Sequence, residues 1–217
     1  MLEDLVSGLL FTRTRVREVE DIGPHFRRVA VESETAGALR YRAGDKVQVR
    51  VGGWKLRTFT PFTLAAAPEL VQLLVFHHAP SPAGIWARSL AVGDLLELFG
   101  PRKSIVLEEI GGATLFGDET SIAAALSTTR SVLETDHESE VREVLARFGA
   151  TGVTLVPRRH GDEHLRELGE RLRAEAEPLV LTGRAQSIQS MRSHLGAERK
   201  RIAKTKAYWS VGRSGLD

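Results

Sequence analysis

The sequence predicts a two-lobed protein, with an N-terminal antiparallel β-barrel followed by an α/β lobe with a parallel sheet. Two observations carry this prediction. Up to about residue 106, short strand-like segments alternate with turn residues. After residue 112, strand and helix patterns alternate, which is typical of an open parallel sheet wrapped by helices. We place the boundary at residue 108, so that the expected domains are residues 1–108 and 109–217.

The expected strands of the first domain are short runs rich in apolar residues. They span residues 26–31, 46–51, 56–60, 70–76 and 95–99. Turn-forming pairs such as Gly23-Pro24 and Gly52-Gly53 separate them, because glycine and proline favour the backbone angles of tight turns. Strands at this spacing indicate an antiparallel barrel or sandwich.

In the second domain we expect strands at residues 113–116, 131–134, 153–156, 178–181 and 207–210, and helices at 119–128, 138–148, 162–176 and 185–195. Ligands of such sheets bind beyond the carboxyl ends of the strands. At the first such end, Asp118 and Glu119 would cap a helix but repel a pyrophosphate. The Gly-x-Gly-x-x-Gly pattern of dinucleotide-binding turns is absent from the sequence. At a later end, Arg184 is expected either to meet a phosphate or to stay solvated.

Composition narrows the function classes. The formal net charge is only +2, which disfavours a nucleic-acid partner. The chain has no cysteine, so disulfides, iron–sulfur clusters, thiolate metal sites and a cysteine nucleophile are excluded, and no metal site is expected. The first residues are acidic rather than basic, and no apolar run approaches the ~20 residues of a membrane span. We therefore expect a cytoplasmic protein without membrane insertion. The sequence does not determine its oligomeric state.

Two segments of the second domain are rich in ionisable side chains. His160 and His164 are four residues apart, but Gly161 interrupts the helix between them, and we expect a solvated loop rather than a zinc site. Residues 184–213 hold eight basic residues against one acidic residue, Glu198. Such a segment is either a solvated surface or a rim that attracts anions. Its candidate contacts for an anionic substrate are Lys204, Lys206 and Arg213.

The most informative segments lie in the first domain. Arg57-Thr58-Phe59-Thr60 places a cation, an aromatic ring and two hydroxyls in one strand, with Arg57 and Phe59 on the same face. Further along, Ser81 is a candidate N-cap for a helix. A helix start presents free backbone N–H groups, which suit a phosphate. Together the two segments offer a phosphate site, a stacking ring and a hydroxyl donor, as a flavin nucleotide requires.

These segments, taken in order, resemble the siderophore-interacting proteins, FAD-containing ferric-siderophore reductases of the ferredoxin reductase-like superfamily. The Arg-Thr-Tyr-Thr of that family is matched by residues 57–60, and its Gly-Asp-x-Leu-x-Leu-x-Gly-Pro-Arg by residues 93–102. Its Gly-Asp-Glu-Thr stands intact at residues 117–120. Its Gly-Pro-Ala-Ser-x-Trp-Ala is matched in part at residues 81–87, and its Gly-Tyr-Trp-x-x-Gly at residues 207–212. The resemblance covers nearly the whole chain.

The resemblance implies FAD as cofactor, NADH or NADPH as electron donor, a ferric siderophore as substrate and a ferredoxin as a further candidate partner. Arg57 and the backbone of residues 81–85 would hold the pyrophosphate, and Phe59 would stack on the isoalloxazine. The implied catalytic residues are Thr60, Asp118 and Thr120. The implied cofactor-binding residues are Arg57, Thr58, Phe59, Thr60, His77, Ser81, Ala83, Gly84, Ile85, Trp86, Asp118, Thr120, Tyr208 and Trp209.

Several residues depart from the family pattern. Phe59 lacks the tyrosine hydroxyl, which removes one hydrogen bond worth about 0.5–1.5 kcal/mol. Gly84 replaces a serine, His78 a glycine and Arg184 a glutamate. Two alternatives therefore stay open beside the siderophore reductase. One is a related flavin reductase that feeds a protein electron acceptor, and the other is a binding protein that has lost flavin turnover.

Overall fold

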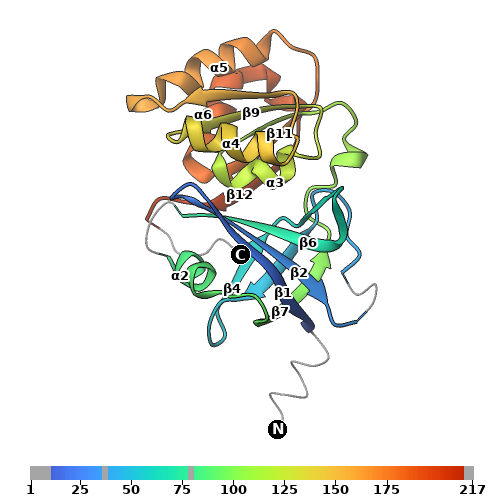
Figure 1. Cartoon of the computed structure of the whole chain (residues 1–217). Coiled ribbons are helices and arrows are strands. Elements are labelled where there is room, and N and C mark those ends of the chain that lie inside the picture. The colour runs from blue at the N-terminus through green and yellow to red at the C-terminus, as the bar shows by residue number, and fades with distance from the viewer. Residues whose placement is uncertain (1–10, 36–38, 78–80, 213–217) are drawn as a thin grey trace. The chain divides into compact units, whose positions relative to one another are not determined.

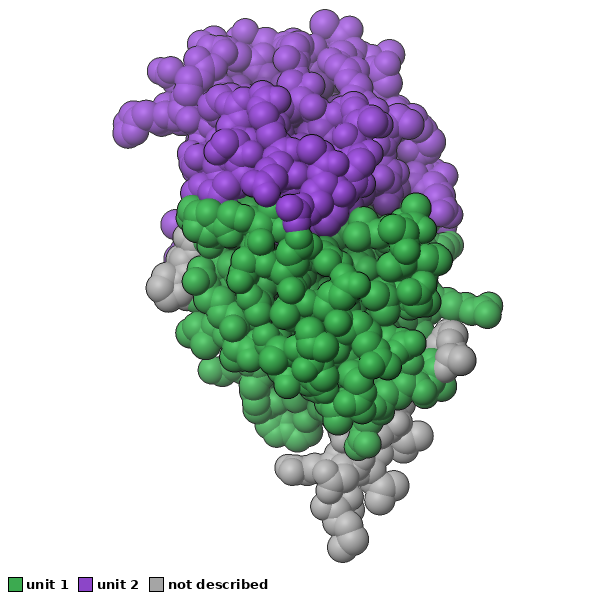
Figure 2. All heavy atoms as spheres, viewed as in Figure 1, with its two compact units in different colours: residues 1–106 green, residues 107–217 purple. Residues whose placement is uncertain are grey.

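The computed structural model of the chain describes residues 11–35, 39–77 and 81–212. The chain divides into two compact units, residues 1–106 and residues 107–217 (Figure 2). Each unit is built on a sheet of its own, seven-stranded in the first and five-stranded in the second. The expected pairing of an antiparallel barrel with an α/β lobe is confirmed.

The sheet of the first unit contains β1 (Phe11–Ile22), β2 (Phe26–Ser33), β3 (Lys46–Arg50), β4 (Leu56–Phe59), β5 (Phe62–Leu64), β6 (Ala67–Phe76) and β7 (Leu95–Arg102). Its strand order is β4-β3-β7-β1-β2-β6-β5, and the pairings are antiparallel. The two end strands, β4 and β5, are separated in sequence only by Thr60 and Pro61. This short link draws both ends of the sheet together, so the sheet curls into a barrel (Figure 1).

Strand β1 was missing from the expected strands because charges dominate it. Its inward residues Thr14 and Val16 are fully buried. Its outward residues form ion pairs across the sheet, including Arg15 with Glu34 at 2.9 Å. The buried side of the barrel is a cluster of valines and leucines to which Val16 belongs. A period-two pattern with charged outward residues is therefore a strand even where its mean hydropathy is low.

One helix, α2 (Pro82–Ser89), lies between β6 and β7. It begins at the predicted N-cap, Ser81, and Pro82 stands at the first helical position, where its missing N–H costs no hydrogen bond. The Ser81 Oγ accepts a hydrogen bond from the Gly84 N–H at 3.1 Å. This cap fixes the start of α2 close to the end of β6.

The second unit holds β8 (Thr114–Gly117), β9 (Arg130–Thr135), β10 (Val153–Pro157), β11 (Leu179–Arg184) and β12 (Ile202–Trp209). The order is β10-β9-β8-β11-β12 and the pairings are parallel. The longer helices are α4 (Glu138–Arg147), α5 (Glu163–Arg173) and α6 (Ala185–Leu195) (Figure 1). From β8 the chain adds β9 and β10 on one side of the sheet and then β11 and β12 on the other side. Ligands of this sheet type bind beyond the carboxyl ends of the strands at such a switch point, here between β8 and β11.

Two elements of the second unit differ in length from the expectation. The predicted helix at 119–128 is a single turn of 3₁₀ helix, η2 (Glu119–Ser121), followed by the short α3 (Ile122–Ala125). The predicted strand at 207–210 begins earlier, at Ile202, because Lys204 and Lys206 belong to an edge strand. Lysines on an edge strand discourage pairing with other chains. Among the described residues, no helix combines the length and the apolar character that a membrane crossing requires.

Candidate functional site

The first group of candidate residues lies where β4 meets α2. The Phe59 and Trp86 rings pack with centroids 5.9 Å apart and planes tilted by 37°. Both rings are half-buried against the core of the barrel. Arg57 lies two residues earlier on β4 and is also half-buried, with its Nη1 donating to the Leu56 carbonyl at 2.7 Å. The strand therefore holds a guanidinium beside an aromatic pair.

His77 lies against the start of α2. Its side chain is buried, yet neither Nδ1 nor Nε2 has a hydrogen-bond partner among the described residues. Burial lowers the pKa of His77, and the positive charge of Arg88 lowers it further. The ring is thus held neutral, with one nitrogen as donor and one as acceptor. Buried polar atoms without partners are rare in folded proteins and mark places where a ligand or water completes the bonding.

Gly84 is explained by the closeness of His77. A Cβ built at Gly84 would lie 3.0 Å from His77 Nδ1 and 3.2 Å from Ser81 Oγ. A serine at this position, as the resembling family has, would press on both groups. The glycine lets the first turn of α2 approach the histidine ring directly.

The backbone donors at the start of α2 are partly used within the helix cap. The Gly84 N–H donates to Ser81 Oγ, and the Ile85 N–H donates to the Ser81 carbonyl at 2.9 Å. Pro82 has no N–H. Within the described residues this leaves the Ala83 N–H as the donor of the first turn that the cap does not use. Ile85 is 67% exposed, so its side chain does not close the site.

The other candidates of this unit are placed as follows. Thr58 pairs in register with Gln48 of β3, and Thr60 directly follows β4; both are half-buried. The structure brings Phe59 together with Trp86, and His77 together with Ser81 and Gly84. His78 lies outside the described residues.

A second group gathers at the carboxyl ends of β8, β11 and β12 around Asp118, which is fully buried. Its Oδ1 accepts hydrogen bonds from the N–H of Thr120 at 2.9 Å and from the Thr120 hydroxyl. Its Oδ2 accepts from the Arg184 N–H at 2.7 Å and from Trp209 Nε1 at 2.8 Å. A carboxylate offers about four lone-pair positions, and here the chain itself supplies four donors.

Two glycines make this packing possible. A Cβ at Gly183 would lie 2.5 Å from Asp118 Oδ2, and Gly183 has φ of +92°. A Cβ at Gly117 would lie 2.4 Å from Ser121 Cβ. The motifs at residues 117–120, 182–184 and 208–209 therefore converge on one carboxylate. Burial raises the pKa of Asp118 to about 6, and the hydrogen bonds from Thr120 and Trp209 oppose that rise.

A buried polar network next to this group was missed by the sequence analysis. Arg158 binds both oxygens of Glu119, at 3.0 and 2.7 Å, and also contacts Glu134 at 3.5 Å. Glu119 and Glu134 are buried. Glu134 was detectable as a carboxylate at the end of an otherwise apolar strand, since a buried carboxylate needs a cation or donors. Nothing in the sequence named Arg158 as its partner.

The same network corrects the prediction of a solvated loop at residues 160–164. His164 is buried, and its Nδ1 accepts the Arg159 N–H at 3.1 Å. Its Nε2 then carries the proton and donates to Glu134 at 2.8 Å. His160 and Gly161 are exposed as expected, but His164 lies in the core at the start of α5.

Arg184 is neither solvated nor free for a phosphate. Its Nη2 contacts Asp162 at 2.7 Å and its Nε donates to Ser187 Oγ at 2.6 Å. Lys204 is exposed and Lys206 half-buried on β12, and Tyr208 is half-buried on the same strand. Arg213 lies outside the described residues.

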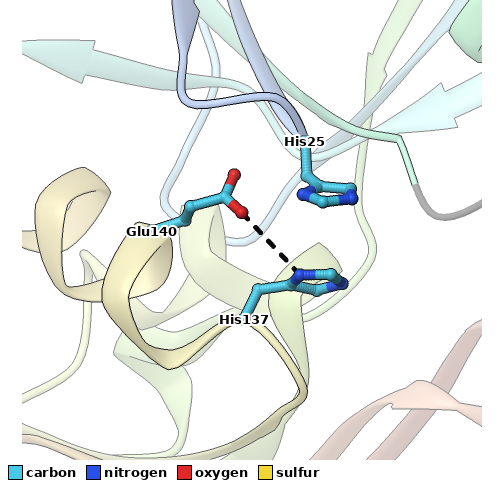
Figure 3. Close-up of side chains that lie close together, drawn as sticks. All are labelled: His25, His137 and Glu140. Carbon is cyan, nitrogen blue, oxygen red and sulfur yellow. Dashed lines mark ion pairs between the residues drawn. The ribbon is translucent and has the colours of Figure 1, made fainter.

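A histidine–glutamate pair marks the start of α4. His137 Nδ1 and Glu140 Oε1 lie 3.8 Å apart (Figure 3). His25, the third residue drawn, belongs to the turn between β1 and β2 in the other unit. Glu140 lies in the first turn of α4, where the helix dipole favours a carboxylate. The position of Glu140 in the first turn of α4 is therefore enough to explain why this pair forms.

Comparisons with known proteins place this fold. No family model matches the sequence, and no curated protein sequence matches it. Among solved structures, a siderophore utilization protein from T. fusca superposes with a TM-score of 0.73 at 22% identity, covering 95% of each chain. The siderophore-interacting protein from Acinetobacter baumannii gives a TM-score of 0.71 at 16% identity, covering 94% of this chain and 92% of that one.

A reductase is similar as well. Phthalate dioxygenase reductase, described as a modular structure for electron transfer from pyridine nucleotides to [2Fe-2S], gives a TM-score of 0.71 at 14% identity. The match covers 95% of this chain and 70% of that one. At these identities the likeness establishes the fold, which is ferredoxin reductase-like.

Proposed function

We propose that this protein is an FAD-dependent reductase of ferric siderophores with NADH or NADPH as electron donor. The observation that carries the proposal is the group on β4 and α2: Arg57, the Phe59–Trp86 pair, and His77, whose ring nitrogens beside Gly84 have no partner among the residues that the structure describes. A cation, a stacking surface and open polar atoms occur together on one barrel, and solved structures with this fold include a siderophore-interacting protein and an electron-transfer reductase.

The residues of the first unit fit FAD. Arg57 would bind the pyrophosphate, together with the Ala83 N–H that the helix cap leaves unused. Ser81, Gly84 and Ile85 would shape that turn, because the N–H groups of Gly84 and Ile85 are bound to the Ser81 hydroxyl and carbonyl oxygens inside the cap. Phe59 would support the isoalloxazine and Thr60 would donate toward its redox-active edge. His77 would complete its bonding against the nucleotide. Bound FAD would supply the redox chemistry, which the side chains alone lack.

The residues of the second unit do not fit a pyrophosphate at the β8 turn. Asp118 is negatively charged when ionised, and the chain already fills its acceptor positions. Thr120 directs both its N–H and its hydroxyl to this carboxylate. We therefore propose that Asp118 and Thr120 hold the end of β12 in place. Tyr208 and Trp209 on β12 stay the proposed cofactor-binding residues of this unit.

The proposed substrate is an anionic ferric siderophore. Reduction of Fe(III) to Fe(II) by one electron weakens its binding to hard oxygen ligands, so the iron is released. Lys204 on the edge strand β12 is exposed and would attract the anionic chelate, with Lys206 and Arg213 in the same role.

Visible absorbance during titration with FAD tests the cofactor. The wild-type protein should bind FAD, and Arg57→Ala should weaken binding about 10–100-fold, since a hydrogen-bonded charge is worth about 1.5–3 kcal/mol. Arg13→Ala, an exposed arginine on β1, is the matched control and should bind as the wild type does. Unchanged FAD affinity in Arg57→Ala would remove the pyrophosphate role, and a chain that takes up no FAD would end the reductase proposal.

The electron acceptor is tested with the FAD-loaded protein under anaerobic conditions. NADH and NADPH are added separately, followed by a ferric siderophore or by an oxidised ferredoxin. Faster oxidation of the reduced flavin by the siderophore than by the ferredoxin supports the proposed substrate. Oxidation by the ferredoxin alone would instead favour a reductase that feeds a protein acceptor.

A further inference from the structure

A cavity of about 360 Å³ lies on the second unit, between α6 and the 3₁₀ segment η4 (Gly196–Arg201). It is lined by Ala185, Ile188, Gln189, Arg192, Ser193 and Arg199. The α6 residues recur every three or four positions, so they share one face of the helix. Cavities of about 300–1,000 Å³ are the size of small-molecule sites. No candidate residue discussed so far lines this one.

Two unneutralised guanidinium groups mark the cavity. Arg192 and Arg199 are exposed, and neither forms an ion pair or a side-chain hydrogen bond with any residue that the structure describes. The acid next to Arg199 in the sequence does not neutralise it, because Glu198 contacts Arg201 at 3.3 Å and Lys200 at 3.8 Å. Arg158 and Arg184 of the same unit, by contrast, are bound to carboxylates.

The rest of the lining is mixed in character. Ile188 is 5% exposed and forms an apolar surface together with Ala185. The Ser193 hydroxyl donates to the Gln189 carbonyl at 3.2 Å, so its oxygen can still accept a hydrogen bond. The Gln189 side-chain amide adds both a donor and an acceptor. Sites for small molecules combine an apolar wall with a few polar groups in this way.

We propose that this cavity binds a small molecule through an oxyanion group, phosphate or carboxylate, held between Arg192 and Arg199. Guanidinium groups match the paired oxygens of both anions and stay charged at all physiological pH values. The remainder of the ligand would lie on Ala185 and Ile188. This inference is independent of the proposed flavin function, because the cavity and the β4–α2 group share no residue.

Calorimetric titration of the full chain with three probes tests the proposal and separates the two sources of the anion. The probes are inorganic phosphate, AMP and citrate. Tighter binding of AMP than of phosphate supports a phosphorylated ligand, and tighter binding of citrate supports a carboxylate ligand. Failure of all three to bind at about 10 mM, where even affinities weaker than 1 mM are measurable, overturns the proposal.

Two variants locate the bound probe. The double variant Arg192→Gln with Arg199→Gln should weaken its binding at least about tenfold. Ser193→Glu should do the same by placing a carboxylate beside both arginines, at an exposed helix position that leaves the fold intact. Retention of wild-type affinity in both variants overturns the proposal.

The control for a general charge effect is Arg171→Gln with Arg173→Gln. Both residues are exposed in the last turn of α5, and the change in net charge is identical. This control should bind the probe within about twofold of the wild type, because distant exposed charges are screened by salt. An equal loss in the control would overturn the proposal, since it would place the effect in overall charge. Circular dichroism confirms that every variant is folded.

Discussion

At the scale of single residues, the second unit depends on how closely its backbone approaches Asp118. Gly183 has no Cβ, and its place beside Asp118 Oδ2 leaves no room for one. From the sequence alone, Gly183 at a strand end is expected only to permit a tight turn, which is half of its role. The other half is contact, and contact between residues 65 positions apart cannot be deduced from a single strand end.

Gly183→Ala should therefore destabilise the protein by more than backbone strain alone. A non-glycine residue in the left-handed region costs about 1–2 kcal/mol, and here the new Cβ also displaces a carboxylate. Gly149→Ala is the matched control, because Gly149 also has a positive φ, +68°, but open space around it. Urea denaturation should show a larger loss for Gly183→Ala. Equal losses would mean that Asp118 moves aside without cost.

Trp209 reports the protonation of Asp118 because its Nε1–H donates to Oδ2. Burial raises the pKa of Asp118 to about 6 from an ordinary value of 3.8. The fluorescence difference between the wild type and Trp209→Phe should therefore change with a midpoint near pH 6. The folded chain holds this proton more tightly than the unfolded chain, so this group alone lowers stability as pH rises from about 4 to about 6. A difference spectrum that stays flat between pH 5 and 7 would contradict the assignment.

At the scale of elements, sequence patterns located most strands but misjudged those whose charges are satisfied by neighbours. β1 and the first half of β12 carry arginine and lysine at alternating positions, and ion pairs or an edge position explain them. The start of α2 was predictable because Ser81 and Pro82 act locally. The burial of His164 at the start of α5 was not predictable, because its partner Glu134 lies on β9, far from it in the sequence. Local chemistry is readable from the sequence, whereas partners across the fold are not.

Arg158 ties the ends of β8, β9 and β10 together through Glu119, Glu134 and Asp136. Burial alone would lower the pKa of Arg158, but its carboxylate partners outweigh burial and raise it. Arg158→Ala should destabilise the protein by about 3–5 kcal/mol, because it leaves the buried Glu119 without a cation and leaves Glu134 with only Arg184, at 3.8 Å.

The control for Arg158→Ala is Arg142→Ala, which removes an exposed pair with Glu138 on α4. It should cost about 0.3–0.5 kcal/mol. Chemical denaturation of both variants measures the difference. A loss below about 1 kcal/mol for Arg158→Ala would show that water reaches the two carboxylates after truncation.

At the scale of the whole molecule, the resemblance in sequence and the likeness in structure agree on a ferredoxin reductase-like fold, although identity to the superposed structures is at most 22%. The fold class followed from the order of strand and helix patterns. The site followed less well: the expected residues on β4 and α2 do gather, whereas Asp118 and Arg184 are bound to their own chain.

FAD should stabilise the chain if the first unit binds it. At a free concentration about 100 times the dissociation constant, binding contributes about 2.7 kcal/mol. For a chain of this size that corresponds to a rise in Tm of about 5–10 °C. Thermal unfolding with and without FAD measures the rise, and Arg57→Ala at the same FAD concentration should show a smaller one. An unchanged Tm in the wild type would argue against a flavin site.

The two-residue link between β4 and β5 has a consequence for how this chain can diverge. Thr60 is the last residue of the proposed flavin-binding segment, and it also belongs to the two-residue link that joins β4 to β5, the two end strands of the sheet. Inserting residues there would widen the barrel without removing a hydrogen bond between paired strands. The insertion would at the same time move the Thr60 hydroxyl. The width of the barrel and the position of the hydroxyl proposed to contact the flavin therefore depend on the same two residues.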